Sequence, residues 1–253
     1  MNTILNEVEI FTSHLKRIAL AFLPLCILVM IFNPLTFQFG MTTSFSVYIF
    51  KMISQSLGII KIIAISPFEA LITDMKIGAM ISLMIISPYI AYEMISFAVP
   101  GLSKRERKLT KLSLIPATVL FILGILFAWY LIIPFLFSFT GKLDIAMGII
   151  PTVSANSFVV AILSIIFAMG LSFELPVIIS GLAFLGIVKT EQLTKNWRYA
   201  VIGSFGIALL ISPGATGGIM ETFIGLTLSG LYGVGVLSSK MIETRRMNYV
   251  ASV

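Results

Sequence analysis

The chain has 253 residues, of which 58% are hydrophobic and 11% are charged, and its net charge is +6. This composition excludes an ordinary soluble globular protein and indicates an integral membrane protein. One cysteine, Cys26, excludes an internal disulfide, and one histidine, His14, leaves too few ligands for the usual metal sites, so we expect neither metal nor cofactor.

The hydrophobic runs predict an all-α membrane protein with six transmembrane helices. A bilayer core about 30 Å thick needs about 20 apolar residues in each helical span. Residues 1–17 form a predicted cytoplasmic arm, and no small-residue cleavage site follows, so we expect an uncleaved first span. The predicted spans are residues 18–37, 71–99, 112–139, 157–188, 199–212 and 219–238, within a single integral membrane domain of residues 1–253.

The segment between the first two spans, residues 40–67, has two faces. Apolar residues recur mostly at three- and four-residue intervals up to Gly58, and the pattern blurs beyond it. Such a helix favours the membrane interface, where it would form an extracytoplasmic cap. An ordinary helix packed on the protein core explains the pattern equally well.

The fourth and fifth spans depart from the length that a bilayer requires. The fourth is longer than necessary, and Pro176 predicts a break within it. The fifth has about 14 residues, which reach only about 21 Å as a helix. We therefore expect local thinning of the bilayer or shelter of this helix by the rest of the protein.

Basic residues predict the orientation of the spans. With both termini in the cytoplasm, most of the 17 Lys and Arg residues lie on the cytoplasmic side, as the positive-inside rule requires. This topology accounts for the positive net charge, so we expect no nucleic-acid partner. The basic residues left outside are Lys51, Lys61, Lys76 and Lys142.

The stretch of residues 97–108 joins the second and third spans. Pro100 and Gly101 end the helix, and a run of charged residues follows. One member of this run, Glu106, is acidic. It is either a local salt-bridge partner of its basic neighbours, or an acid that they hold ionised and oriented for a cationic partner from the cytoplasm.

A single charged side chain, Glu174, lies between residues 158 and 188. A carboxylate at that depth costs about 2.5–3.5 kcal/mol on insertion scales, so we expect a compensating interaction. One interpretation is structural, because Pro176 leaves a carbonyl near Ser172 without its amide partner and Glu174 can help to satisfy this region. The other is functional, because intramembrane acids often line a cavity or bind a polar partner. Glu221, at the outer start of the sixth span, is a weaker candidate of the same type.

Several motifs, in order along the chain, resemble the TatC family, the polytopic subunit of the twin-arginine (Sec-independent) protein translocase. The resemblance extends from the first span to the sixth, and it implies a concave, glove-like bundle of six helices whose last two are short. Its main parts are Phe-Ala-Val-Pro-Gly-Leu-Ser-Lys-Arg-Glu-Arg-Lys at residues 97–108, Gly124 to Pro134 with Phe127 and Tyr130, Ser-Phe-Glu-Leu-Pro-Val at residues 172–177, and Arg198-Tyr199.

The resemblance also implies a function. Family members export folded proteins that carry an Arg-Arg signal peptide, using the proton-motive force, and an enzymatic activity is not expected. The implied partners are TatA- and TatB-type single-span subunits, the signal peptides of folded cargo, membrane lipid, and further copies of the chain in a receptor complex. The implied location is a prokaryotic plasma membrane, with a mitochondrial inner membrane as the alternative.

The family motifs assign candidate site residues. Phe97 and Glu106 fall where the family contacts the twin-arginine region, with Lys104 and Arg105 beside them. Glu174 falls where the family has an intramembrane polar residue that faces the concave side.

Two acids of the family pattern are missing. The N-terminal arm lacks the acid of the family's His-Leu-Glu-Glu-Leu-Arg pattern, and His14 stands near the aligned position, with Glu9 as a possible substitute. The turn between the last two spans lacks the acid that follows the family's Pro-Pro, with Glu221 as a possible replacement. We therefore expect the signal-peptide site to use fewer acids, or different ones.

Two other classes of protein fit these residues less well. A proton- or ion-coupled small-solute transporter could use Glu174, but it should have two related halves, and the sequence contains no internal repeat. An intramembrane enzyme needs a nucleophile with a base, whereas His14 is the only histidine and no Gly-x-Ser-x-Gly motif is present.

Overall fold

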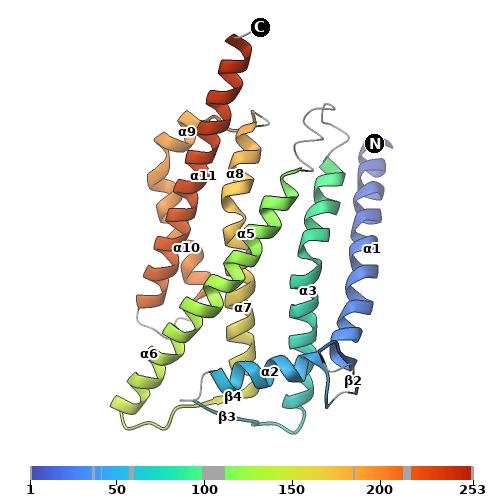
Figure 1. The fold of residues 1–253 in the computed structure, drawn as a ribbon, viewed down its shortest axis with the longest axis vertical. Coiled ribbons are helices and arrows are strands. Elements are labelled where there is room, and N and C mark those ends of the chain that lie inside the picture. The colour runs from blue at the N-terminus through green and yellow to red at the C-terminus, as the bar shows by residue number, and fades with distance from the viewer. Residues whose placement is uncertain are drawn as a thin grey trace. The chain divides into compact units, whose positions relative to one another are not determined.

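The computed structural model describes residues 2–35, 38–40, 42–56, 60–98, 112–184, 186–212 and 218–251. Most of these residues are helical (Figure 1). The helices are α1 (Asn2–Ile31), α2 (Phe45–Ser56), α3 (Glu69–Ala98), α5 (Leu114–Phe127), α6 (Ile133–Ala146), α7 (Ala155–Phe173), α8 (Leu175–Phe184), α9 (Thr190–Lys195), α10 (Trp197–Ile211) and α11 (Ile219–Ala251), and a π-helical turn, η2 (Ala128–Ile132), joins α5 to α6. Short strands are β1 (Phe32–Asn33), β2 (Gln38–Phe39), β3 (Lys61–Ile63) and β4 (Thr152–Ser154).

The helix lengths confirm the predicted class, an all-α multi-pass membrane protein. α10 is apolar but has only 15 residues, so it is a short helix, as expected for the fifth span. Together with the five longer apolar stretches, α10 agrees with a bundle of six transmembrane helices. Within the described residues, five stretches are long and apolar enough to cross a membrane: Glu9–Ile31, Glu69–Glu93, Leu114–Ala146, Ala155–Phe184 and Ile219–Glu243.

Two helices extend beyond the bounds that hydropathy predicts. α1 begins at Asn2, so the predicted arm of residues 1–17 is largely continuous with the first span, and it ends at Ile31 rather than near residue 37. α11 continues to Ala251, past the predicted end at residue 238, and is longer than expected. Neither Pro nor Gly follows Gly235, and Lys, Glu and Arg are good helix formers, so the helix persists after its apolar stretch ends.

Residues 40–67 form two elements rather than one helix. α2 ends at Ser56, and β3 pairs in parallel with β4, with Ile62 opposite Val153. β-branched side chains favour extended backbone, so the Ile-rich run of residues 60–63 explains why the helical periodicity blurs in the second half of this segment.

α2 lies across α3 and packs on it with one face. Ile53 is buried, and the hydroxyl of Ser46 donates to the Asp74 carboxylate of α3 at 2.5 Å. Tyr48 and Met52 are exposed. α2 thus has one buried face, which contains a polar contact. The predicted faces are only partly present, because Met52 of the apolar stripe is exposed and Ser44 of the polar stripe is buried.

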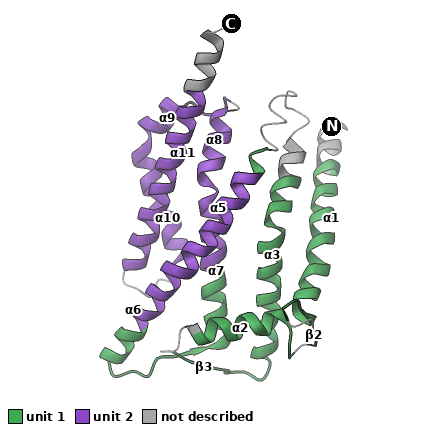
Figure 2. Cartoon of the chain, viewed as in Figure 1, with its two compact units in different colours: residues 1–114, 141–163 green, residues 115–140, 164–253 purple. Residues whose placement is uncertain are grey.

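The chain forms two compact units (Figure 2). In unit 1, α1 and α2 pack against α3, and in unit 2, α11 packs against α8, α9 and α10. Unit 1 comprises Met1–Leu114 and Gly141–Leu163, and its core includes Val29, Ile53, Ile77, Ile86 and Phe158. Unit 2 comprises Ile115–Thr140 and Ser164–Val253, and its core includes Phe121, Met169, Ile179, Ala208 and Ile224.

In unit 2, α5 and α7 approach closely where Gly124 meets Gly170. A Cβ atom on Gly124 would lie 2.5 Å from the carbonyl oxygen of Met169 and 2.8 Å from the Cα atom of Gly170. A Cβ atom on Gly170 would lie 2.8 Å from the Phe121 ring. Small residues allow such contact between membrane helices, which gives a physical reason for glycine at position 124.

Two irregularities in the helices of unit 2 occur just before prolines. In η2, the N–H of Ile133 donates to the carbonyl of Ala128, five residues back, and Pro134 follows. α7 ends at Phe173 and α8 begins at Leu175, so the predicted break near Pro176 is present and falls on Glu174.

Candidate functional site

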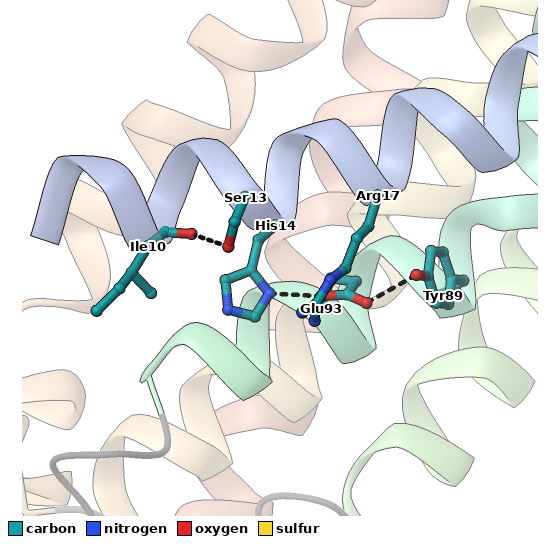
Figure 3. A network of polar contacts seen from close by, with 6 residues as sticks. All are labelled: Ile10, Ser13, His14, Arg17, Tyr89 and Glu93. Carbon is teal, nitrogen blue, oxygen red and sulfur yellow. Dashed lines mark hydrogen bonds and ion pairs between the residues drawn. The ribbon is translucent and has the colours of Figure 1, made fainter. Parts of the chain in front are cut away.

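A buried acid, Glu93, lies near the end of α3 and is held by side chains from two helices (Figure 3). His14 of α1 places its Nδ1 atom 2.5 Å from Oε2 of Glu93. The hydroxyl of Tyr89 donates to Oε1 of Glu93 at 2.7 Å. Arg17 of α1 places Nη1 3.8 Å from the same Oε2 atom. We call Glu93, Tyr89, His14 and Arg17 the Glu93 cluster.

Helical spacing builds this cluster. Tyr89 and Glu93 are four residues apart on α3, and His14 and Arg17 are three apart on α1, so each pair occupies one face of its helix. α1 and α3 run side by side, which brings the two faces together (Figure 1). At Gly78 of α3, the absence of a Cβ atom lets Met30 of α1 approach closely.

The members of the cluster differ in exposure. The side chain of Glu93 is 5% exposed and that of His14 is 15% exposed, whereas that of Arg17 is 60% exposed. A buried carboxylate needs hydrogen bonds or opposite charge to offset its lost hydration, and Tyr89 and His14 supply these contacts. Arg17 lies at the solvent-accessible edge, and a longer, exposed ion pair of this kind contributes little stability.

The sequence did not predict this cluster. Glu93 fell near the end of a predicted span, where a charge is tolerated. Two signals pointed to it: Tyr89 one helical turn earlier, and His14, the chain's only histidine, in the helix that precedes α3. Neither signal shows that the two residues meet, because 79 positions separate His14 from Glu93.

Glu174, in unit 2, occupies the break between α7 and α8 and is half-buried. In the part of the chain that the structure describes, its carboxylate has no hydrogen bond or ion pair. The hydroxyl of Ser172 donates to the carbonyl of Ala168 at 2.7 Å, not to Glu174. The structural interpretation, in which Glu174 satisfies backbone groups beside Pro176, therefore gains no support.

Glu221 begins α11 and is 7% exposed. The hydroxyl of Ser212, at the end of α10, donates to Oε1 of Glu221 at 2.8 Å. An acid in the first turn of a helix also interacts favourably with the helix dipole. Glu221 thus links the ends of two neighbouring helices of unit 2.

Four phenylalanine rings of unit 2 form a cluster, and two of them lie close to these acids in the sequence. The ring centroid of Phe127 lies 5.3 Å from that of Phe173 and 6.2 Å from that of Phe223, and the Phe135 centroid lies 6.0 Å from that of Phe223. Phe173 directly precedes Glu174, and Phe223 follows Glu221 by two residues. The cluster joins α5, α6, α7 and α11 in one apolar contact.

At the other end of α3, two charged side chains contact Asn156, which lies at the start of α7 within unit 1. Oε1 of Glu69 accepts the backbone N–H of Asn156 at 2.9 Å, and Nζ of Lys76 donates to Oδ1 of Asn156 at 2.7 Å. A cavity of about 480 Å³ lies nearby between α2, β3 and α3, and Asp74 and Thr73 are among its lining residues. These contacts join α3 to the start of α7.

The residues predicted for the signal-peptide site fall largely outside the described residues. Lys104, Arg105 and Glu106 do so entirely. Phe97 belongs to α3, four residues after Glu93, but its side chain is outside the described part. Glu9 is exposed on α1. Among the described residues, no three His, Cys, Asp or Glu side chains gather closely enough to hold a metal ion.

Comparison with known proteins decides the family. The family model of the Sec-independent protein translocase protein (TatC) matches residues 7–224. The chain belongs to the TatC family. It is 31% identical to TatC of Synechocystis sp. over 179 residues, which cover 71% of this chain and 70% of that one. It is 29% identical to TatC of Escherichia coli K12 over 198 residues, which cover 78% of this chain and 74% of that one.

A solved structure confirms the fold. A crystal structure of the twin-arginine translocase receptor TatC matches with a TM-score of 0.76 at 24% identity, over 94% of this chain and 99% of that chain. The chain is thus a multi-pass membrane subunit of a Sec-independent protein translocase, and TatC is a transport component rather than a catalytic one.

Proposed function

We propose that this TatC chain is the receptor of a twin-arginine translocation system. It binds Arg-Arg signal peptides at the cytoplasmic face and, with TatA- and TatB-type single-span subunits, moves folded proteins across the membrane using the proton-motive force. The observation that carries the proposal is the family match over residues 7–224, which includes both the charged stretch after α3 and the break at Glu174.

The proposed signal-peptide site contains Phe97, Lys104, Arg105 and Glu106, with Glu9 as a further acid. Guanidinium groups pair with carboxylates through two parallel hydrogen bonds, which an ammonium group cannot reproduce. An acid among bases is also kept ionised by its neighbours. Glu106 is therefore suited to distinguish Arg-Arg from Lys-Lys.

The proposed partner site contains Glu174 and Glu221. A half-buried carboxylate at membrane depth is costly, and Glu174 has no side-chain partner among the described residues. A polar side chain on the helix of a single-span subunit would supply the missing hydrogen bond. We propose the same role, in addition to its contact with Ser212, for Glu221.

The proposed topology places both termini in the cytoplasm and the region of α2, β3 and β4 on the opposite side. It leaves most basic residues inside, in accord with the positive-inside rule. The cytoplasmic end of α3 is then the end that carries Glu93 and leads to Glu106. We also propose that several copies of the chain assemble in the receptor complex.

The experiment is a binding measurement with purified protein in lipid nanodiscs. A fluorescent signal peptide with Arg-Arg should bind at least tenfold more tightly than the same peptide with Lys-Lys. Glu106→Gln should remove most of this preference, whereas Glu191→Gln, an exposed acid on α9, should leave it unchanged. Equal binding of the two peptides by the unmodified protein would contradict the proposal.

A further inference from the structure

We infer that Glu93 is a second acid of the signal-peptide site and receives one guanidinium group of the arginine pair. His14 and Arg17 occupy its carboxylate in the peptide-free chain and give way when the peptide binds. This inference rests on the proposed function and names a residue that the sequence motifs did not.

The two carboxylate oxygens of Glu93 have different partners. Oε1 accepts the Tyr89 hydroxyl from the same helix. Oε2 is approached only from α1 in the described structure, by His14 and Arg17. Oε2 is therefore the exchangeable oxygen, because movement of α1 alone frees it while Tyr89 continues to orient the carboxylate.

Arg17 shows that this carboxylate can accommodate a guanidinium group. Its Nη1 atom lies 3.8 Å from Oε2, beyond hydrogen-bond distance, and most of its side chain is in contact with solvent. Arg17 therefore approaches Oε2 from the solvent-exposed edge of the cluster. A peptide arginine that arrives along this edge can form the close, charge-assisted pair that Arg17 does not form.

α1 is also suited to move aside. In the most apolar stretch of α1, only 6% is buried within the protein, compared with 33% in the corresponding stretch of α3. Leu20 and Leu23, six and nine residues after His14, are mostly exposed. A helix with few buried contacts separates from its neighbours at a lower free-energy cost than a core helix does. The contact between His14 and Glu93 can then break and re-form, unlike contacts in the rigid core.

The position of Glu93 matches the need for two acids. Glu93 lies one turn before Phe97 on α3 and 13 residues before Glu106 in the chain. Two adjacent arginines require two acceptors to be desolvated without an unpaired charge. Two acids of α1 and α3 at this end have side chains that the structure describes. Glu9 is exposed, and Glu93 is buried and lies near the guanidinium group of Arg17.

The test measures binding of four peptides, with Arg-Arg, Lys-Arg, Arg-Lys and Lys-Lys, to the unmodified protein and to variants in nanodiscs. Glu93→Gln should weaken Arg-Arg binding about tenfold. It should also make the protein insensitive to lysine at one of the two positions and leave it sensitive at the other. His14→Ala should strengthen Arg-Arg binding several-fold, because the resident partner is gone, and Ser13→Ala, which does not touch Glu93, should change nothing.

The outcomes separate this inference from the proposed function. If the unmodified protein prefers Arg-Arg and Glu93→Gln keeps the full preference at both positions, the inference is wrong and the proposed function stands. If His14→Ala weakens binding of all four peptides as Glu93→Gln does, Glu93 only ties α1 to α3, and the inference is again wrong. If the unmodified protein shows no preference, the proposed function itself fails.

Discussion

Gly124 provides the sharpest test of the packing in unit 2. In the substitution Gly124→Ala, the new methyl group would lie 2.5 Å from the Met169 carbonyl oxygen, 2.8 Å from the Gly170 Cα atom and 3.0 Å from the Met169 carbonyl carbon. All three atoms belong to the backbone, so no change of rotamer relieves the contact. α5 and α7 must separate, and overpacking of this kind costs about 1–3 kcal/mol.

Gly203→Ala in α10 is the matched control, because a Cβ atom there meets nothing within 4 Å. Replacing glycine by alanine within a helix gains about 0.5–1 kcal/mol through backbone entropy, and this gain applies at both positions. The difference between the two variants therefore isolates the packing cost, and we expect Gly124→Ala to be less stable than Gly203→Ala by about 1–3 kcal/mol.

The assay is equilibrium unfolding of both variants in the same detergent, followed by intrinsic fluorescence and by circular dichroism to check that the transition is cooperative. If the free energies of unfolding of the two variants agree within about 0.5 kcal/mol, α5 and α7 are not in backbone contact at this point, and the reasoning is wrong.

Three further predictions concern the polar residues. Glu174→Gln should raise the free energy of unfolding by about 1 kcal/mol, since it removes a half-buried carboxylate for which the described residues supply no side-chain partner. It should also abolish export in a strain that lacks its own TatC, and a stability loss would contradict this reasoning. Ser212→Ala should lower the free energy of unfolding by about 1 kcal/mol, because Glu221 loses its 2.8 Å hydrogen bond, and the double variant with Glu221→Ala should show that the two losses are not additive. Glu69→Gln should speed hydrogen exchange at the amide of Asn156, because a neutral oxygen is a weaker acceptor than a carboxylate; unchanged exchange would mean that this bond does not hold the start of α7.

Hydropathy and prolines made much of the fold predictable. A span of about 20 apolar residues produces a strong local signal, and the α7–α8 break follows from Pro176, because a proline cannot supply the amide that the helix needs. The ends of the helices were less predictable, because helix propensity continues where hydropathy stops, as in α11. The β3–β4 pair was missed because a two- or three-residue strand has no periodic pattern of its own.

The candidate sites show the same division between local and long-range information. Glu174 was predicted because one charge in a long apolar run is visible in the sequence alone. The Glu93 cluster was not, since it depends on which faces of α1 and α3 meet, and side-chain spacing within each helix does not determine that pairing. The sequence placed Lys76 only among the basic residues on the outer side, whereas its ammonium group donates to Asn156, 80 positions away.

The acids of the membrane helices differ in how the chain satisfies them, and this difference separates their proposed roles. Glu93 has resident partners on a helix that is little buried within the protein, so a guanidinium group of the peptide can replace them without leaving the carboxylate unpaired. Glu174 has no side-chain partner among the described residues, so a group on another membrane helix or a water molecule can stabilise it. An acid that exchanges partners suits transient binding of a signal peptide, and an acid that no described side chain contacts suits assembly with another membrane helix.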